Sequence, residues 1–322
     1  MKLPRRLLTV LAVALFATAG YLFFIRDGGA PPQARTPAAA GALEDSSTAP
    51  LASGGTAPSP LAVRLDGAAD PVHVDFKKPP KAALVFDLDT GKVLWRREPT
   101  KVLPIASLTK MMTALVVVER VPEGAKVRIT NEALRYTGSG VGVLPRGKWI
   151  GVNTMLHGLM LPSGNDAAIA LAQRAAKGSE KRFVRYMNEK AKALGLQCTR
   201  FSSPSGIKDK GNHSCAADLA AIARAVMLEP RLTKIVKRRQ AVLPFPIKGG
   251  RLWLYNHNPL LRAGYPGTTG LKTGYTDAAG RCIVATARRG PIKLGVVLLD
   301  SPDPGKQAMQ LLDRGFKASG ST

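Results

Sequence analysis

Residues 104–115 read PIASLTKMMTAL and place Ser107 three positions before Lys110 in a stretch that is otherwise mostly apolar or small. On a helix these two positions share one face, about one turn apart. We expect a helix from this point to about residue 119, with most of its surface buried. A buried lysine loses solvation of its charge, so its pKa falls. A neutral amine beside a serine can take the hydroxyl proton and so create a nucleophile.

Two further triplets extend this pattern. Ser163-Gly164-Asn165 follows Ser107 by 56 positions, and Lys272-Thr273-Gly274 follows Ser163 by 109 positions. A single S-x-x-K, S-x-N or K-T-G triplet is common by chance. Three in this order form the signature set of penicillin-binding proteins and related serine enzymes.

The motifs and their surroundings resemble the low-molecular-mass penicillin-binding proteins, the serine-type D-alanyl-D-alanine carboxypeptidases. The resemblance covers roughly residues 75–318 and includes the stretches 163–168 and 270–276. It implies an α+β domain of the β-lactamase/transpeptidase-like fold. Such a domain has a mainly antiparallel sheet flanked by helices, together with a helical subregion. It also implies penicillin and other β-lactams as covalent inhibitors, and no cofactor or metal.

The resemblance assigns a role to each motif. Ser107 is expected to attack the carbonyl between two terminal D-alanines, with Lys110 as the base and Ser163 relaying a proton to the leaving amine. The backbone N–H groups of Ser107 and Tyr275 are expected to form the oxyanion hole. The substrate-binding residues that the resemblance implies are Asn165, Lys272, Thr273, Gly274 and Tyr275.

Other interpretations of the motifs remain open. Ser163 and Asn165 could form a loop and helix cap, and the 272–274 triplet could lie on a solvated edge strand. Residues 229–233, EPRLT, are similar to the loop that carries the deacylating glutamate of class A β-lactamases, but we interpret them as a helix end. The alternative functions are a β-lactamase, an endopeptidase or transpeptidase acting on cross-links, and a non-catalytic wall-binding protein.

The N-terminal part divides into two segments. Residues 1–26 carry three basic residues ahead of an uncharged run from Leu7 to Ile25, which is near the length of a membrane span. We interpret this segment as a membrane anchor, with a removed signal peptide as the alternative; either exports the chain. Residues 27–72 are rich in Ala, Pro, Gly, Ser and Thr and are expected to be a linker. The catalytic domain is expected to occupy residues 73–322.

The charge of the chain limits its partners. The formal net charge is +25, and residues 73–322 hold 41 of the 47 basic and 17 of the 22 acidic residues. Such a charge calls for an anionic partner. Export argues against nucleic acid and leaves anionic wall polymers or lipid headgroups. The four histidines show no metal-ligand spacing.

Hydrophobic patterns predict the remaining elements. A β-hairpin is expected over residues 82–95, and the sheet is expected to be completed by strands at 270–274, 282–287 and 294–299. The predicted helices lie at 153–160, 166–177, 183–194, 218–228 and 307–316, with Asp166 as the cap of the second.

The chain has three cysteines. Cys198 and Cys215 lie 17 positions apart, and an oxidising compartment would permit a disulfide between them. Cys282 falls in the strand expected beside the Lys272 strand, where we expect a buried free thiol.

Overall fold

The structure is a computed structural model that describes residues 59–320, apart from residues 68–69 and 248. The predicted membrane segment at 1–26 and most of the predicted linker lie outside these residues. Within the described part, no helix combines the length and the apolar character needed to cross a bilayer. Residues 55–322 form one compact unit, and the hydrophobic cores of the described residues lie wholly inside it, so this unit has what it needs to fold alone.

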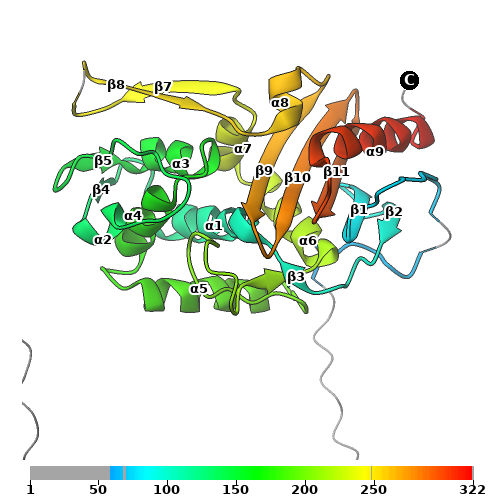
Figure 1. Cartoon of the computed structure of the whole chain (residues 1–322), viewed down its shortest axis with the longest axis horizontal. Coiled ribbons are helices and arrows are strands. Elements are labelled where there is room, and N and C mark those ends of the chain that lie inside the picture. Colours follow the sequence, from blue (N-terminus) through cyan, green and yellow to red (C-terminus); the bar gives the residue numbers. More distant parts are fainter. Residues whose placement is uncertain (1–58, 68–69, 248, 321–322) are drawn as a thin grey trace, which may run out of the picture. The chain divides into compact units, whose positions relative to one another are not determined.

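A five-stranded antiparallel sheet, ordered β2-β1-β11-β10-β9, forms the centre of the unit (Figure 1). Its inner strands consist largely of buried aliphatic residues, as expected for a sheet covered on both faces. The predicted hairpin is confirmed as β1 and β2. The strands are β1 (Ala82–Asp87), β2 (Val93–Arg97), β9 (Thr268–Thr276), β10 (Gly280–Arg289) and β11 (Ile292–Leu299).

Helices cover both faces of the sheet, and α7 (Pro230–Val236) and α8 (Pro259–Ala263) also contact the strand β9. The amphipathic C-terminal helix α9 (Pro304–Ala318) packs on β11 and β10, and α6 (Ala216–Leu228) packs on the opposite face. The side chains under α9 form a smaller hydrophobic cluster of their own, whereas α6 belongs to the main core. The sheet is therefore held between two layers of helix, with β2 and β9 as its two edge strands.

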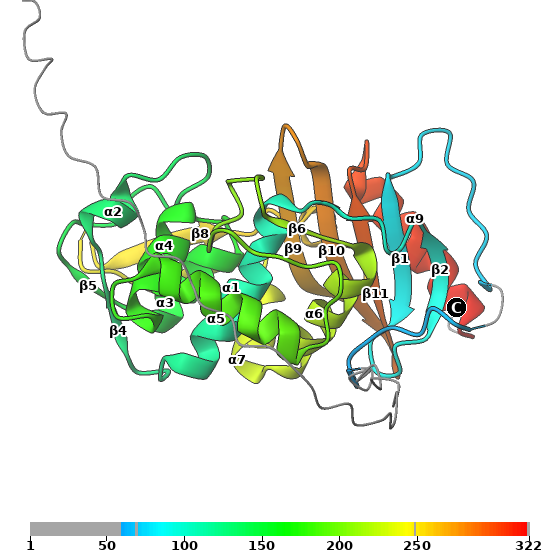
Figure 2. The ribbon, with the colours of Figure 1, turned by 90° about the horizontal axis from the view of Figure 1, so that it is seen from below.

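A helical subregion lies beyond the β9 edge (Figure 2). A one-turn 3-10 helix η1 (Ala106–Thr109) leads into α1 (Lys110–Arg120), whose side chains are almost all buried from Lys110 to Val117. The other elements here are α2 (Asn131–Leu134), α3 (Val152–Met160), α4 (Asn165–Ala175), α5 (Glu180–Ala193) and the two-stranded pairs β3 (Leu103–Pro104) with β6 (His213–Ser214) and β4 (Lys126–Arg128) with β5 (Trp149–Gly151).

Several elements were not predicted, among them α2, the short strands β3 to β6, and the segment that follows α6. The predicted helix end at residues 229–230 is confirmed, because α6 ends at Leu228. Pro230 is also the first residue of a helix that was not predicted, α7 (Pro230–Val236), at a position where the missing N–H of proline costs no hydrogen bond. A two-stranded hairpin follows, β7 (Gln240–Pro244) with β8 (Arg251–Tyr255), and then the short helix α8 (Pro259–Ala263).

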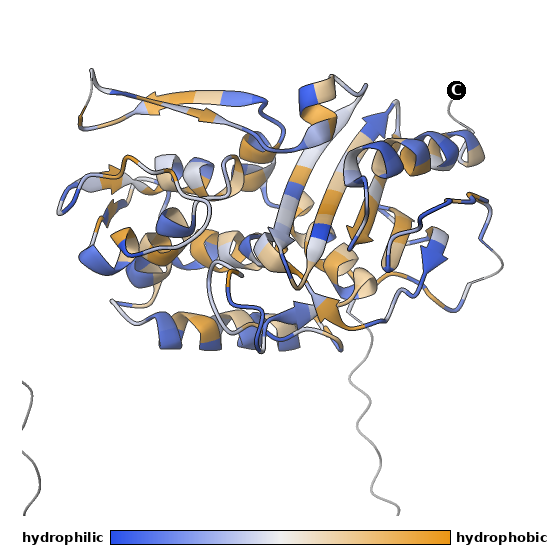
Figure 3. Ribbon diagram, in the orientation of Figure 1, coloured by the Kyte–Doolittle hydropathy of each residue, from blue (hydrophilic) through white to orange (hydrophobic). Residues whose placement is uncertain are grey.

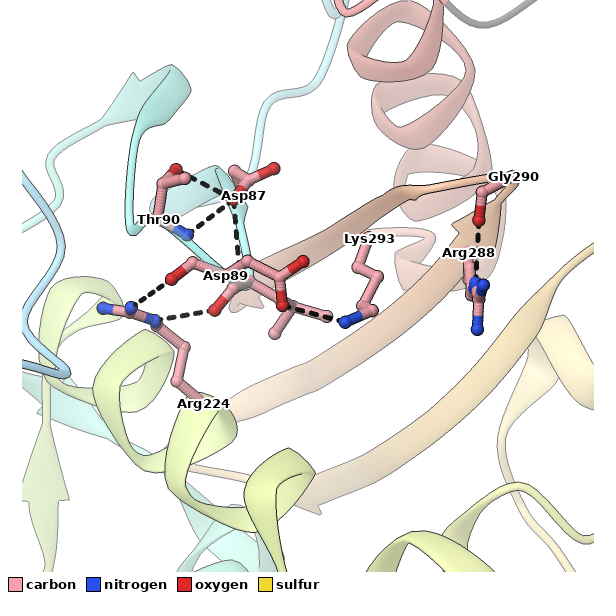
Figure 4. Close-up of polar contacts among 8 residues, drawn as sticks. Asp87, Asp89, Thr90, Arg224, Arg288, Gly290 and Lys293 are labelled. Carbon is pink, nitrogen blue, oxygen red and sulfur yellow. Dashed lines mark hydrogen bonds and ion pairs between the residues drawn. The ribbon is translucent and has the colours of Figure 1, made fainter.

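The packed chain begins ahead of the boundary expected at residue 73. The Arg224 side chain, on α6, is buried and donates to four backbone carbonyls of the described residues, and Figure 4 shows the contacts in the β1–β2 turn. Two of these carbonyls belong to Leu88 and Asp89 in the β1–β2 turn, and two to Pro60 and Ala62. This cluster, which we call the Arg224 clamp, fixes the incoming chain to both the sheet and α6.

The cysteines occupy defined places. The sulfur atoms of Cys198 and Cys215 are bonded to each other, with 5.6 Å between the two Cα atoms. The bond closes the loop between α5 and α6. Cys282 lies in β10 opposite Gly274 of β9 as a buried free thiol, as predicted.

Candidate active site

The turn that carries Ser107 packs against the end of strand β9. Ser107 is half-buried in η1, and Ala106 before it has a φ of +46°, a conformation that non-glycine residues rarely adopt. A Cβ placed on Gly274 would lie 3.1 Å from both the Ser107 nitrogen and the Ile105 carbonyl oxygen. The sheet edge therefore approaches the Ser107 turn so closely that glycine is the residue best suited to position 274.

Lys110 lies at the centre of a buried hydrogen-bond network. Its Nζ is 2.8 Å from Ser107 Oγ, 2.6 Å from Asn165 Oδ1 and 2.7 Å from the carbonyl oxygen of Ser205. The side chain has no exposed surface. The spacing that predicted a Ser107–Lys110 pair thus corresponds to direct contact in the structure.

The surroundings favour the neutral amine of Lys110. Burial, followed by the positive charge of Lys272, lowers the pKa of Lys110 well below its usual value. A neutral amine has two N–H donors and one lone pair. The two N–H groups match the oxygens of Asn165 and Ser205, and the lone pair can accept the Ser107 proton. The geometry is that of a base ready to activate a serine.

Lys272 and Ser163 form a second buried pair. Lys272, on β9, donates to Ser163 Oγ at 2.9 Å and to the Thr273 carbonyl at 2.8 Å. Burial lowers the pKa of Lys272 to about 7. Ser163 has a φ of +64°, so its backbone is held in a sparsely populated conformation. The three motifs that are distant in the sequence therefore converge between β9 and the helical subregion.

Asn165 and Asp166 attach the loop at 137–142 to α4. Asn165 donates to the Thr137 carbonyl at 2.6 Å, in addition to its contact with Lys110. Asp166 was predicted to cap α4, but the cap position is Gly164. The buried Asp166 carboxylate accepts from the backbone N–H groups of Val141 and Gly142 at 2.9 and 3.0 Å, and from that of Ala167 in the first turn of α4 at 2.7 Å. It fixes a glycine-rich loop beside the catalytic groups.

A further set of residues supports the site and was not identified from the sequence. Asn212 donates to Thr109 Oγ1 at 2.8 Å, and that hydroxyl donates to the Ala106 carbonyl at 2.7 Å. Ser205 contributes its carbonyl to Lys110. Asn212 and Ser205 belong to one loop, and only the tertiary structure brings this loop to the site. No local sequence motif predicts their role.

The remaining predicted site residues line the end of β9. Thr273 and Gly274 are half-buried beside the Ser107 turn. Tyr275 is 62% exposed, and its hydroxyl donates to Asp277 at 2.9 Å. The oxyanion-hole role concerns the backbone N–H of Tyr275, and it stays a prediction.

Glu229, the residue behind the β-lactamase alternative, has another partner. Its carboxylate accepts from the Arg231 backbone N–H at 3.0 Å and caps the N-terminus of α7. A glutamate cap is an ordinary helix-start feature, in line with a structural role for this stretch.

Comparisons with known proteins give a consistent result. A family model described as Peptidase S11, D-alanyl-D-alanine carboxypeptidase, matches residues 72–303. The chain is 36% identical over 244 residues to D-alanyl-D-alanine carboxypeptidase DacF of Bacillus subtilis. The aligned region covers 73% of this chain and 62% of that protein. It therefore spans about three-fifths of the length of that relative.

The chain is also similar to a protein named as an endopeptidase and to a solved structure. A D-alanyl-D-alanine endopeptidase of Pseudomonas aeruginosa is 37% identical, over 68% of this chain and 71% of its own length. The crystal structure of a D-alanyl-D-alanine carboxypeptidase from Mycobacterium tuberculosis superposes with a TM-score of 0.72. The identity there is 33%, over 78% of this chain and 96% of that one.

Proposed function

The chain belongs to the D-alanyl-D-alanine carboxypeptidase family, and from this premise we propose that it removes the terminal D-alanine from peptidoglycan stem pentapeptides. The observation that carries the proposal is the 2.8 Å contact between Ser107 Oγ and the fully buried Lys110 amine. The same groups support covalent inhibition by β-lactams, whose strained amide presents a similar carbonyl to the serine.

The proposed reaction has two halves. In the first, Ser107 Oγ attacks the carbonyl between the two D-alanines while its proton passes to Lys110 Nζ. The carbon–nitrogen bond breaks, and Ser163, held by Lys272, relays a proton to the nitrogen of the departing D-alanine. In the second half, water attacks the acyl-enzyme ester, releasing the shortened peptide and restoring the Ser107 hydroxyl.

Substrate recognition is assigned to the β9 side of the site. The Thr273 hydroxyl and the Lys272 charge would bind the terminal carboxylate, and Asn165 would position the peptide. The backbone N–H groups of Ser107 and Tyr275 would stabilise the oxyanion. One such donor typically contributes about 10²–10³ in rate.

The chain would act in the bacterial cell envelope. We propose that residues 1–26 hold it at the cytoplasmic membrane with the catalytic domain outside, or direct its secretion if they are removed. A linker over residues 27–58 would allow the domain to reach stem peptides at a distance from the membrane.

The test measures D-alanine released from a synthetic pentapeptide ending in D-Ala-D-Ala, with Ser107→Ala as the blank. Intact-mass spectrometry after incubation with benzylpenicillin should show one penicilloyl adduct in the parent chain and none in Ser107→Ala. A parallel sample contains cross-linked stem-peptide dimers.

The possible results separate the candidate functions. Release of D-alanine with a persistent penicilloyl adduct supports the carboxypeptidase. Cleavage of the dimers without D-alanine release would identify an endopeptidase instead. Rapid loss of the adduct, dependent on Glu229, would identify a β-lactamase. Absence of any adduct would leave a non-catalytic protein of the same fold.

The two buried lysines predict a bell-shaped pH profile. Lys110 must be neutral to accept a proton, so kcat/KM should rise with pH as it deprotonates. Lys272 must be charged to bind the carboxylate, so kcat/KM should fall as pH rises through about 7. In Lys272→Arg the guanidinium stays charged, so the alkaline limb should disappear even if the maximum rate is lower. An unchanged alkaline limb in this variant would assign it to another group.

A further inference from the structure

The β7–β8 hairpin presents Val242, Trp253 and Tyr255 on its solvent-exposed outer face, flanked there by Gln240 and Arg251. Along both strands buried and more exposed residues alternate, and Figure 3 shows that the hairpin ribbon carries both hydrophobic and hydrophilic segments. On the inner side Ala241, Leu252 and Leu254 belong to the main core. On the outer side Val242 lies directly opposite Trp253. Trp253 is 55% exposed, and Tyr255, two residues along the same strand, is 58% exposed. The fold thus holds two exposed aromatic rings on a firmly packed support.

The segment around this face has a strongly one-sided charge. Residues 230–276 contain nine Lys and Arg and no Asp or Glu. Six of the basic side chains are exposed, and no described carboxylate lies within ion-pair distance of any of them. These six are Lys234, Lys237, Arg238, Arg239, Arg251 and Arg262.

Part of this charge surrounds a hollow next to the aromatic face. An open depression of about 1090 Å³ lies between the hairpin and α8, lined by Arg239, Tyr255 and Arg262 among others. The guanidinium of Arg239 donates to the Arg262 backbone carbonyl at 3.2 Å, so the Arg239 side chain reaches α8. A hollow with two arginines and a phenol at its rim offers charge-assisted donors to a phosphate group.

We propose that the outer face of the β7–β8 hairpin docks on a membrane surface through anionic phospholipid headgroups. Trp and Tyr rings prefer the boundary between headgroups and acyl chains, since one end of each ring system is apolar and the other polar. Arg and Lys around them attract anionic lipids. The aliphatic Val242 beside Trp253 favours a lipid surface over a fully hydrated anionic polymer, which would leave that side chain in water.

The test is co-sedimentation of residues 55–322, the compact unit without the N-terminal apolar run, with lipid vesicles. Vesicles of phosphatidylglycerol and phosphatidylcholine are compared with pure phosphatidylcholine, at low and high salt. Strong binding is expected only to the anionic vesicles, weakening as salt is added. Arg239→Ser/Arg262→Ser should weaken binding by roughly fivefold per charge. Trp253→Ser/Tyr255→Ser should weaken it at least tenfold and abolish a blue shift of tryptophan emission.

Two matched controls make the result specific. Arg314→Ser/Lys317→Ser removes the same charge from exposed positions on α9, and Leu228→Ser removes an equally exposed apolar side chain from α6. Both should bind vesicles within about twofold of the parent. An equal loss in the α9 variant would overturn the proposal because binding would then follow total charge, and an equal loss in Leu228→Ser would overturn it because any exposed apolar side chain would then serve.

Binding of a soluble polyanion tests the alternative partner for this face, an anionic polymer. If polyphosphate binds through Arg239 and Arg262 while vesicle binding is absent or independent of Trp253, the face serves an anionic polymer and the membrane proposal is wrong. No substrate is present in these measurements. Failure here therefore leaves the proposed carboxypeptidase activity untouched, and that activity on a soluble pentapeptide should be unchanged in the Trp253 variant.

Discussion

Lys110→Met is expected to acylate with penicillin about 10²–10⁴-fold more slowly than the parent chain, the usual contribution of a positioned general base. Methionine has nearly the length of the lysine stem and fills the same buried space, so the Ser107 turn should keep its position. What disappears is the amine 2.8 Å from Ser107 Oγ. Without it, the hydroxyl has no described base within hydrogen-bond distance.

The stability of the same variant makes the result interpretable. Removing a buried amine relieves its desolvation, whereas the carbonyl oxygens of Asn165 and Ser205 lose their donor. Because these effects oppose each other, the free energy of unfolding should change by less than about 2 kcal/mol.

Acylation would be followed with a fluorescent penicillin, and stability by thermal unfolding. Lys101→Met removes an exposed lysine from the same part of the chain and should leave both quantities unchanged. Acylation of Lys110→Met at the parental rate would exclude Lys110 as the base.

Gly206→Ala is expected to cost about 4 kcal/mol of stability and to impair acylation as well. Gly206 has a φ of +76°, and an added Cβ would lie 2.5 Å from Thr109 Oγ1 and closer still to the Ala106 carbonyl oxygen. Backbone strain and steric overlap each typically contribute about 1–3 kcal/mol. The overlap can be relieved only by moving the Ser107 turn or the Ser205 carbonyl away from Lys110.

Gly211→Ala is the matched control for this prediction. Gly211 lies in the same loop with a φ of +74°, but its nearest neighbour to an added Cβ is 3.6 Å away, an ordinary contact. This variant should carry the backbone strain alone, about 1 kcal/mol, with normal acylation. Chemical denaturation of both variants gives the comparison. Equal destabilisation would mean that close packing against Ala106 has no energetic effect.

The sequence predicts the catalytic pairs but not their supporting contacts. Ser107 and Lys110 are found by spacing within one helical turn, and Ser163 and Lys272 by short motifs in a fixed order. The Ser205 carbonyl and the Asn212 side chain reach the site through tertiary folding of a loop, and a backbone carbonyl carries no residue signature. Asp166 was placed correctly at the start of a helix, yet its carboxylate binds loop N–H groups that helix periodicity cannot identify.

The unpredicted elements have local causes as well. Proline ends a helix and also favours the first position of the next, so Pro230 alone cannot tell α6 ending from α7 beginning. The alternation in β7 and β8 is short, and the connection between them, residues 245–250, contains both proline and glycine. Such a hairpin is recognised only once its inner residues are seen in the core.

The Arg224 clamp has a consequence for how this domain can be joined to other sequences. It contacts the incoming chain only through main-chain oxygens, which every amino acid possesses, and it holds them at two positions separated by one residue. Substitutions of the side chains at positions 60 and 62 should therefore leave the Arg224 clamp intact. An insertion or deletion there would move the two carbonyl acceptors out of register with the Arg224 guanidinium. Fusion partners, tags or alternative linkers are best attached before residue 59, where the Arg224 clamp sets no limit on the length of the added sequence.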